Sequence, residues 1–469
     1  MKVVKEAKSA IMKIWGKQTI KNSKYRPIYY MLSVPADDEL LLYHVMTEEL
    51  LALDAEERAE FEKFSGNLSR ENILGNFADG PKPVLEELIR KHFLVPVDYD
   101  EAKAVDQLRL IINRMKPKGK FTSYAILPTT YCNARCFYCY ESDYRHENMT
   151  EEIAHRLVEF IMEHCDKEDM LHLHWFGGEP LVGINRIDQI CDELRENGYQ
   201  YASRMTSNAY LFTEEVVKRA KENWNLQSIQ ITLDGTEDIY NQTKSYKNIK
   251  GSPYYRVLDN VEYLVKEDIH VQLRMNLGWH NAENLRDLIN ELGDRFSEYK
   301  SFVAYVGILF DGKGFETVHH TTEDKIGLLK VQQELETLIT AQGISANKNG
   351  KLPGLKVAFC MADNDKGLLV NPLGGFGKCE HGIFDGLVGS IENDQLDQKM
   401  VDAWKKPIVW EKCRTCPLHP SCYFISKCEN VEECLDVKQE YDIKGYQTLV
   451  RRTYKAWKEN ISKKHKNNT

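Results

Sequence analysis

The stretch Cys132-Asn-Ala-Arg-Cys136-Phe-Tyr-Cys139 places three thiols on one short segment, directly after an apolar stretch that ends at Thr129. Iron–sulfur cubes are normally held by four cysteine thiolates, so a loop that offers three leaves one iron open to an external ligand. The pattern therefore predicts a cluster with an open iron, which is a site for chemistry. A zinc knuckle, or buried thiols without a metal, is the alternative that the trio alone leaves open.

The cysteine loop begins a region in which strand-like and helix-like segments alternate. Apolar stretches typical of strands occur at Tyr124–Thr129, Leu171–Phe176, Ser203–Ser207, Ser228–Leu233, Val271–Asn276 and Phe302–Phe310. Segments with helical spacing of apolar residues lie near 150–165, 184–197, 213–223, 256–267, 282–296 and 322–342. Six strands that alternate with helices predict an α/β fold with a parallel sheet, either open or closed into a partial barrel.

The polar and glycine-rich motifs of this region follow its strands. The cysteine trio comes after the first strand, Gly177-Gly-Glu-Pro180 after the second, Ser207-Asn208 at the end of the third and Asp234-Gly235 after the fourth. Active sites in parallel folds gather at the carboxyl ends of the strands. We therefore expect these motifs to share one site.

The spacing of the trio resembles the radical S-adenosylmethionine superfamily, whose signature loop is CxxxCxxC, as at 132–139. The resemblance implies a partial (β/α)6 barrel over residues 120–345. It also implies that S-adenosylmethionine chelates the open iron, and that its one-electron reduction yields a 5′-deoxyadenosyl radical that abstracts hydrogen from a substrate.

The same resemblance assigns cofactor contacts to residues at the strand ends. Gly177, Gly178 and Glu179 look like the GGE motif that binds the methionyl amine, with glycine permitting close backbone approach. The resemblance also implies that Ser207 and Asn208 contact the ribose or carboxylate and that Tyr138 lies beside the adenine. Lys244 stands where many relatives carry a carboxylate-binding arginine. Arg274 and Asn276, at the end of the fifth strand, are further candidates. No side-chain acid or base can be assigned from the sequence.

Seven further cysteines lie late in the chain, at Cys360, Cys379, Cys413, Cys416, Cys422, Cys428 and Cys434. Their pattern resembles the SPASM extension, which implies an iron–sulfur domain over 350–440 with two auxiliary clusters, and hence three [4Fe–4S] clusters in all. By that resemblance Cys413, Cys416, Cys422 and Cys434 fill the distal cluster, and Cys360, Cys379 and Cys428 hold the one nearer the barrel. Zinc sites are the alternative. The two remaining cysteines, Cys165 and Cys191, have helical spacing with apolar residues and are expected to be inert core thiols.

The two ends of the chain flank these domains. Residues 1–27 predict a basic helix, centred on 3–15, and residues 441–469 predict another. Residues 28–105 lie between the first of these helices and the barrel. They predict a winged-helix-like module with strands at 28–34, 40–44 and 93–97 and helices at 54–64 and 84–92. It resembles the recognition elements of ribosomal peptide maturases, in which the leader of the precursor adds a strand to a sheet edge.

Composition limits the remaining function classes. The 469 residues include 62 Lys and Arg against 71 Asp and Glu, a net charge of −9 that argues against a nucleic-acid-binding protein. No apolar run is long enough for a membrane span, and no secretory signal is evident, so we expect a cytoplasmic protein.

Taken together, the motifs predict a radical S-adenosylmethionine peptide maturase that installs a thioether or carbon–carbon crosslink in a ribosomally made precursor. Its expected electron donor is a flavodoxin or a ferredoxin. A sulfatase-maturase-like side-chain oxidase and a peptide epimerase are the alternatives within this class. A zinc-stabilised peptide-binding adaptor without turnover is the alternative from another class.

Overall fold

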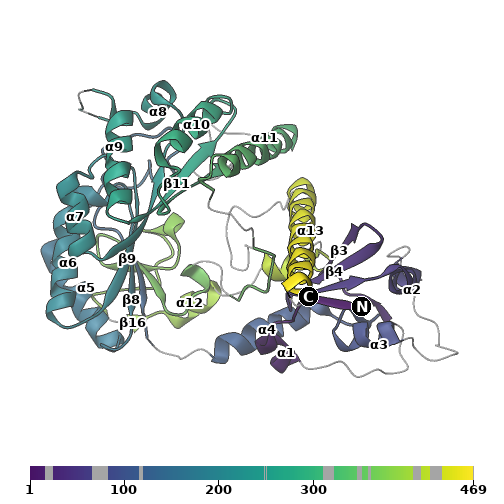
Figure 1. Ribbon diagram of the computed structural model, residues 1–469. Coiled ribbons are helices and arrows are strands. Elements are labelled where there is room, and N and C mark those ends of the chain that lie inside the picture. Colours follow the sequence, from purple (N-terminus) through teal and green to yellow (C-terminus); the bar gives the residue numbers. More distant parts are fainter. Residues whose placement is uncertain are drawn as a thin grey trace.

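The computed structural model shows an open, partial α/β barrel, called the barrel below, and an N-terminal module, with the long C-terminal helix α13 (Asp436–Asn467) running between them (Figure 1). The residues that the structure describes are 1–15, 25–65, 83–115, 120–247, 249, 251–309, 322–345, 351–357, 361–393, 395–404, 413–422 and 436–467. Within these ranges, none of the helices combines the length and the apolarity that crossing a lipid bilayer requires.

Six parallel strands form the barrel sheet. They are β7 (Ser123–Ile126), β8 (Leu171–Trp175), β9 (Tyr201–Ser207), β10 (Leu226–Thr232), β11 (His270–Leu277) and β12 (Phe302–Ile308). Each strand pairs with the next one along the chain, and every pair is parallel. The structure thus confirms the predicted α/β class and the six parallel strands. Strand boundaries differ from the prediction by a few residues.

Helices cover the outer face of this sheet, as Figure 1 shows for α5, α6, α7 and α9. Their bounds are α5 (Glu151–His164), α6 (Ile184–Glu196), α7 (Glu214–Glu222), α8 (Glu237–Lys244), α9 (Pro253–Lys266), α10 (Asn284–Phe296) and α11 (Thr322–Ala341), with a short 3-10 turn η1 (Pro180–Gly183) before α6. Alternate strand residues such as Leu171, Leu173 and Trp175 point into the core between sheet and helices, which also buries Cys165 and Cys191 as expected. Helix α8 was not predicted.

The barrel sheet continues beyond β7 into the cysteine-rich part of the chain. Strand β13 (Gly367–Val370) pairs parallel with β7, and β14 (Gly375–Gly377), β15 (Gly389–Ser390) and β16 (Gln395–Leu396) follow as antiparallel neighbours. Short elements complete the region: η2 (Met361–Asp363), η3 (Glu380–Gly382), α12 (Gln398–Trp404) and η5 (His419–Ser421). Part of the region predicted as a separate domain therefore extends the barrel itself.

The N-terminal module contains a four-stranded antiparallel sheet in the order β1-β5-β4-β3. Its strands are β1 (Lys2–Lys5), β3 (Met31–Ala36), β4 (Glu39–His44) and β5 (Glu49–Leu53). A second pair joins β2 (Tyr25–Pro27) to β6 (Leu94–Pro96), and the helices are α1 (Ser9–Trp15), α2 (Ala55–Ser65), α3 (Pro83–Arg90) and α4 (Glu101–Met115). The prediction of a helix over 3–15 was wrong at its start, because the strand that contains the β-branched Val3 and Val4 pairs with β5 instead.

Both faces of this small sheet are covered. Leu40, Leu42 and Leu51 pack with α2 and α3 on one face. On the other, Leu32 and Val34 pack with Val450 and Tyr454 of α13. The hydroxyl of Tyr43 also donates to the backbone oxygen of Pro353, at 2.6 Å. The module is thus joined to residues near both ends of the cysteine-rich region.

Candidate functional site

The three early cysteines lie on the loop after β7. Their side chains are half-buried and not in disulfides. Backbone bonds tie the loop to the end of α8, because the amide of Arg135 donates to Lys244 O (2.8 Å) and the amide of Lys247 donates to Asn133 O (3.0 Å). The loop is therefore held at the carboxyl end of the sheet, where it was expected.

The donor set of this loop fits an iron–sulfur cluster in number and type. Burial raises the pKa of Cys132 to about 12 and that of Cys139 to about 11, and the thiols of the trio add to each other's pKa by mutual repulsion. A metal that binds thiolates must displace those protons. In the part of the chain that the structure describes, no three or more His, Cys, Asp or Glu side chains are placed to hold a metal ion as they stand.

Two glycines bring the loop after β8 against the cysteine loop. A Cβ on Gly177, whose φ is +111°, would lie 2.3 Å from the backbone oxygen of Thr129. A Cβ on Gly178 would lie 2.5 Å from the backbone oxygen of Tyr131, which also accepts from the amide of Glu179 at 2.9 Å. The close approach that these glycines permit in the structure is to the protein backbone that leads into Cys132.

Glu179 is fully buried beside this loop. Its carboxylate accepts hydrogen bonds from Ser207 Oγ (2.8 Å), the amide of Asn208 (2.8 Å) and the amide of Leu181 (3.2 Å). Burial raises the pKa of Glu179 to about 7, although these donors act in the opposite direction. Asn208 Nδ2 lies 3.9 Å from Cys132 Sγ. The structure thus brings together the cysteine loop, the GGE motif and Ser207-Asn208.

Lys244 lies in a buried network with Asp234. Its Nζ donates to Tyr138 Oη (2.8 Å) and Thr232 Oγ1 (2.6 Å) and lies 3.2 Å from Asp234 Oδ2. The Tyr138 hydroxyl donates to the same carboxylate oxygen, and Asn276 Nδ2 donates to that hydroxyl at 3.2 Å. Burial opposes the charge of Lys244, but Asp234 outweighs it and raises the pKa of the ammonium. All three ammonium donors of Lys244 therefore have protein partners.

Asp234 is the central acceptor of this network; it was expected at the site as one of the strand-end motifs, but without a specific role. Its Oδ1 accepts from the amide of Asn276 at 2.8 Å, and its backbone oxygen accepts from Asn281 Nδ2 at 2.7 Å. The available signal was its position, because an aspartate directly after a parallel strand lies at the edge where sites form.

Arg274 differs from Lys244 in having unused donor capacity. Its Nε is buried and has no hydrogen-bond partner among the described residues. The Arg274 side chain lies against Gly307 of β12: a Cβ added to this glycine would be only 3.1 Å from the Arg274 Nε. Buried guanidinium donors are normally paired, so this side chain is suited to receive an anion from a ligand.

A second polar cluster lies on β8 and β9, on residues to which the sequence analysis gave no role. His174 Nε2 and Thr206 Oγ1 are 3.0 Å apart, and His174 Nδ1 lies 3.4 Å from the Arg204 guanidinium and 3.7 Å from Glu380 Oε1. Burial lowers the pKa of His174 to about 3, which keeps the imidazole neutral. Because Glu380 directly follows Cys379, this cluster joins the barrel strands to the cysteine-rich region.

Four of the seven late cysteines lie within the described residues. Cys379 follows β14, and Cys413, Cys416 and Cys422 share one short segment with turns at both ends. The Arg109 guanidinium of α4 donates to the backbone oxygens of His419 and Pro420 and so anchors this segment. Cys360, Cys428 and Cys434 lie outside the described residues.

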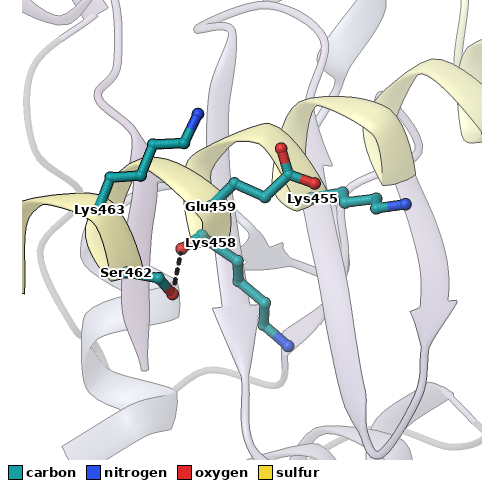
Figure 2. A pocket seen from close by; sticks show the side chains of 5 residues that line it. All are labelled: Lys455, Lys458, Glu459, Ser462 and Lys463. Atoms are coloured by element: carbon teal, nitrogen blue, oxygen red, sulfur yellow. Dashed lines mark hydrogen bonds between the residues drawn. The ribbon is translucent and has the colours of Figure 1, made fainter. Parts of the chain in front are cut away.

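A surface hollow on α13 is unrelated to this chemistry. Figure 2 shows that Lys455, Lys458, Glu459, Ser462 and Lys463 line it along one helix. Three of its five residues are lysines, all five are exposed, and it shares none of the strand-end motifs.

Comparisons with known proteins identify the barrel. Residues 126–292 match the family model described as the radical SAM superfamily. An uncharacterised protein of Methanocaldococcus jannaschii is 30% identical over 128 residues, which are 26% of this chain and 42% of that protein. The radical SAM cyclopropyl synthase TigE of Paramaledivibacter caminithermalis is 22% identical over 258 residues, 45% of this chain and 54% of TigE. The chain thus spans about half the length of these curated relatives.

A solved structure supports the fold. The structure described as native anSMEcpe with bound AdoMet aligns with a TM-score of 0.55 at 16% identity, covering 72% of this chain and 99% of that one. The matched segment of the family model begins in β7 and includes the cysteine loop, the GGE motif, Ser207-Asn208 and Lys244. The segment that carries these residues is therefore a radical SAM domain.

Proposed function

We propose that this protein modifies a ribosomally made peptide, using S-adenosylmethionine and a [4Fe–4S] cluster held by Cys132, Cys136 and Cys139. When bound, this pair of groups supplies a 5′-deoxyadenosyl radical that abstracts a hydrogen atom from a substrate carbon. The observation that carries the proposal is the convergence of the cysteine loop, Glu179 and Asn208 at the carboxyl ends of β7, β8 and β9.

Each residue of the site has a defined part in this proposal. Glu179 would accept the methionyl ammonium, since a carboxylate can accept about four hydrogen bonds and three are already made. Tyr138 would remain at the side of the adenine, with its hydroxyl fixed by Asp234 and Lys244. Lys244 would then act as a positioning residue, because its donors are already committed to the protein.

The late cysteines would hold two auxiliary clusters. They supply seven thiolates where two saturated cubes need eight, so one iron would lack a local cysteine. The residues Cys360, Cys379 and Cys428 would hold that cluster, whose open iron would bind and fix a substrate thiolate. The cluster would supply the acceptor for the one electron released when a carbon radical bonds to the sulfur. Thioether formation is therefore our first choice of product. The electrons for the first step would come from a flavodoxin or ferredoxin.

Carbon–carbon bond formation is the second candidate. It is favoured by the similarity to TigE, whose name describes a cyclopropyl synthase. A peptide substrate agrees with either product, since anSMEcpe has been solved with AdoMet and a peptide, at a TM-score of 0.51 to this chain and 16% identity. Because of that likeness, the test below also includes side-chain oxidation of the sulfatase-maturase type as an outcome.

The test is anaerobic incubation of the reconstituted enzyme with the small peptides encoded beside its gene, read by tandem mass spectrometry. A loss of two hydrogens localised to a linked pair of residues supports bond formation. Alkylation with iodoacetamide then separates the products, because a thioether consumes a thiol and a carbon–carbon bond does not.

Other outcomes identify the alternatives. An unchanged mass with deuterium incorporated from solvent indicates epimerisation. A loss of two hydrogens on one side chain with no link indicates oxidation to a carbonyl if the product reacts with a hydrazine reagent, and ring closure by a carbon–carbon bond if it does not. Metal analysis that finds zinc without iron or sulfide, together with peptide binding and no turnover, would establish the adaptor instead.

A further inference from the structure

The sheet of the N-terminal module is extended by a strand from outside the predicted module. Strand β1 pairs antiparallel with β5, with Lys2 opposite Ala52 and Val3 opposite Leu51. Without β1, the sheet would be the three-stranded meander β3-β4-β5 with the backbone of β5 open at one edge. An open edge of this kind is where an extended peptide can add a strand.

The opposite edge of the same sheet is poorly suited to that role. Its outer strand β3 contains Pro35, which has no backbone N–H to donate. The backbone oxygen of Pro35 already accepts from Arg451 Nε of α13, at 3.1 Å. Of the two edges, the β5 edge is therefore the one that can receive a strand.

The attachment of β1 to this edge is short and partly exposed. The strand has four residues, of which Lys2 is exposed and the other three are half-buried. Its register with β5 shifts between Val3 and Lys5, a bulge that disrupts the ladder. Short, bulged strands contribute few backbone hydrogen bonds, so β1 is held mainly by its side chains. Next to the strand, the Met1 ammonium pairs with Glu57 and the Lys8 amide donates to Thr47 O at 2.8 Å.

Those side chains show what the edge recognises. Lys2 Nζ binds Glu39 Oε1 at 3.0 Å, and Lys5 Nζ binds Glu48 Oε2 at 3.1 Å. Between the lysines, Val3 packs against the core shared with α2 and α3, and Val4 against the core shared with α13. The β5 edge thus binds a basic residue, two apolar residues and a second basic residue in an extended conformation.

We propose that β1 is a displaceable strand that covers a peptide-docking edge on β5, and that its competitor is an extended peptide segment with two apolar residues flanked by basic ones. Displacement exposes the backbone of β5 and frees the positions of Lys2 on Glu39 and of Lys5 on Glu48, while Lys458 stays paired with Glu39 and Lys8 with Glu48. The basic side chains of the incoming segment take the two freed positions. The inference rests on the proposed function, since it specifies the peptide that the enzyme binds.

In any binding test, a free peptide must compete with β1 of the same chain for the edge of β5. A segment of the same chain competes at an effective concentration of about millimolar, so a free peptide at micromolar concentration binds weakly while β1 is intact. Weakening β1 should therefore raise the apparent affinity for a free peptide that copies it.

The probe is a blocked, fluorescein-labelled peptide that copies residues 1–8, measured by fluorescence anisotropy with the full chain. We expect the variant Lys2→Glu, Lys5→Glu to bind this probe about tenfold more tightly than the wild type, because its own strand no longer matches Glu39 and Glu48. The charge-matched control Lys218→Glu, Lys266→Glu changes exposed barrel lysines that pair with Glu214 and Glu262, and it should behave as the wild type.

Two further probes separate strand docking from attraction of charge alone. A peptide with the lysines replaced by glutamate tests the charge preference, and one with N-methylated valines blocks backbone pairing. Both altered peptides should bind far more weakly than the copied peptide to the variant Lys2→Glu, Lys5→Glu, called the opened variant. Equal binding of either altered peptide, or equal affinity of the opened variant and the wild type for the copied peptide, would overturn the proposal.

Hydrogen exchange on the unmodified protein gives a second measurement that does not depend on a variant. Amides of residues 2–5 should exchange much faster than those of 40–43, and a large excess of the copied peptide should deprotect 2–5 while 50–53 stay protected. Deprotection of 50–53 together with 2–5, or no change, would contradict displacement. Cleavage of S-adenosylmethionine without peptide, measured on the same preparation, reports separately on the proposed function.

Discussion

Two cations near the strand ends have opposite environments. Lys244 is buried with Asp234, Tyr138 and Thr232 as partners, whereas the Nε of Arg274 is buried with no partner among the described residues. The family resemblance assigned both to cofactor contacts, Lys244 in place of an arginine after the fourth strand and Arg274 at the end of the fifth. Only the side-chain contacts distinguish a residue that positions the cysteine loop from one that can still receive a ligand anion.

Replacement of Lys244 by methionine should destabilise the protein by about 3–5 kcal/mol, because it leaves the buried carboxylate of Asp234 without its counter-charge. The double variant Lys244→Met, Asp234→Asn should recover part of that loss. Denaturant unfolding of the two variants measures both effects, with the exposed Lys218→Met as control. A double variant as unstable as the single one would show that the pair is not coupled.

The buried carboxylate of Glu179 predicts a dependence of stability on pH. Its folded pKa of about 7 lies above the usual value of 4.5, so the fold favours the protonated form. Ionisation therefore costs stability as pH rises from 4.5 to 7, by roughly 2 kcal/mol between pH 5.5 and 7.5. Unfolding of the metal-free protein should show this slope, and Glu179→Gln should lack it. Identical slopes in the two proteins would refute the assignment.

At the scale of elements, the strands of the barrel were predictable and several connections were not. Strands such as β8 and β10 alternate apolar and polar residues between helix-like segments, so periodicity identifies them. Strand β5 lacks alternation because its residues are buried on both faces. Strand β13 depends on pairing with β7 from a distant part of the chain, which local sequence does not encode.

The contact between the loops after β7 and β8 predicts the effect of enlarging Gly178. A Cβ at this position would lie 2.5 Å from Tyr131 O, so Gly178→Ala must displace the cysteine loop. We expect a loss of about 1–3 kcal/mol in unfolding free energy and a lower iron content after reconstitution. Gly445→Ala is the control, because its Cβ meets nothing within 4 Å. Normal iron content in Gly178→Ala would show that the loop tolerates the shift.

At the scale of the whole molecule, the N-terminal module cannot be removed cleanly. Leu32, Val34 and Tyr43 pack against α13, and Arg109 anchors the segment that carries Cys413 to Cys422. The sequence indicated a separate module because its helices and strands are local, whereas its contacts with α13 join residues more than 400 positions apart.

Deletion of residues 1–115 should therefore expose the apolar face of α13, with Val450 and Tyr454 at its centre, and cause aggregation. Size-exclusion chromatography with light scattering measures this directly. Further deletion of residues 436–469 should reduce the aggregation, since it removes the exposed face. A monodisperse product from the first deletion would show that the module and α13 are independent.

The measurement that tests the central claim most directly is the formation of 5′-deoxyadenosine by the anaerobically reconstituted protein with S-adenosylmethionine and dithionite, quantified by mass spectrometry. The wild type should form it, and the variant with Cys132, Cys136 and Cys139 all replaced by alanine should form none while still binding iron at its late cysteines. Formation of 5′-deoxyadenosine by the triple variant would contradict the assignment of the radical-forming site to this loop.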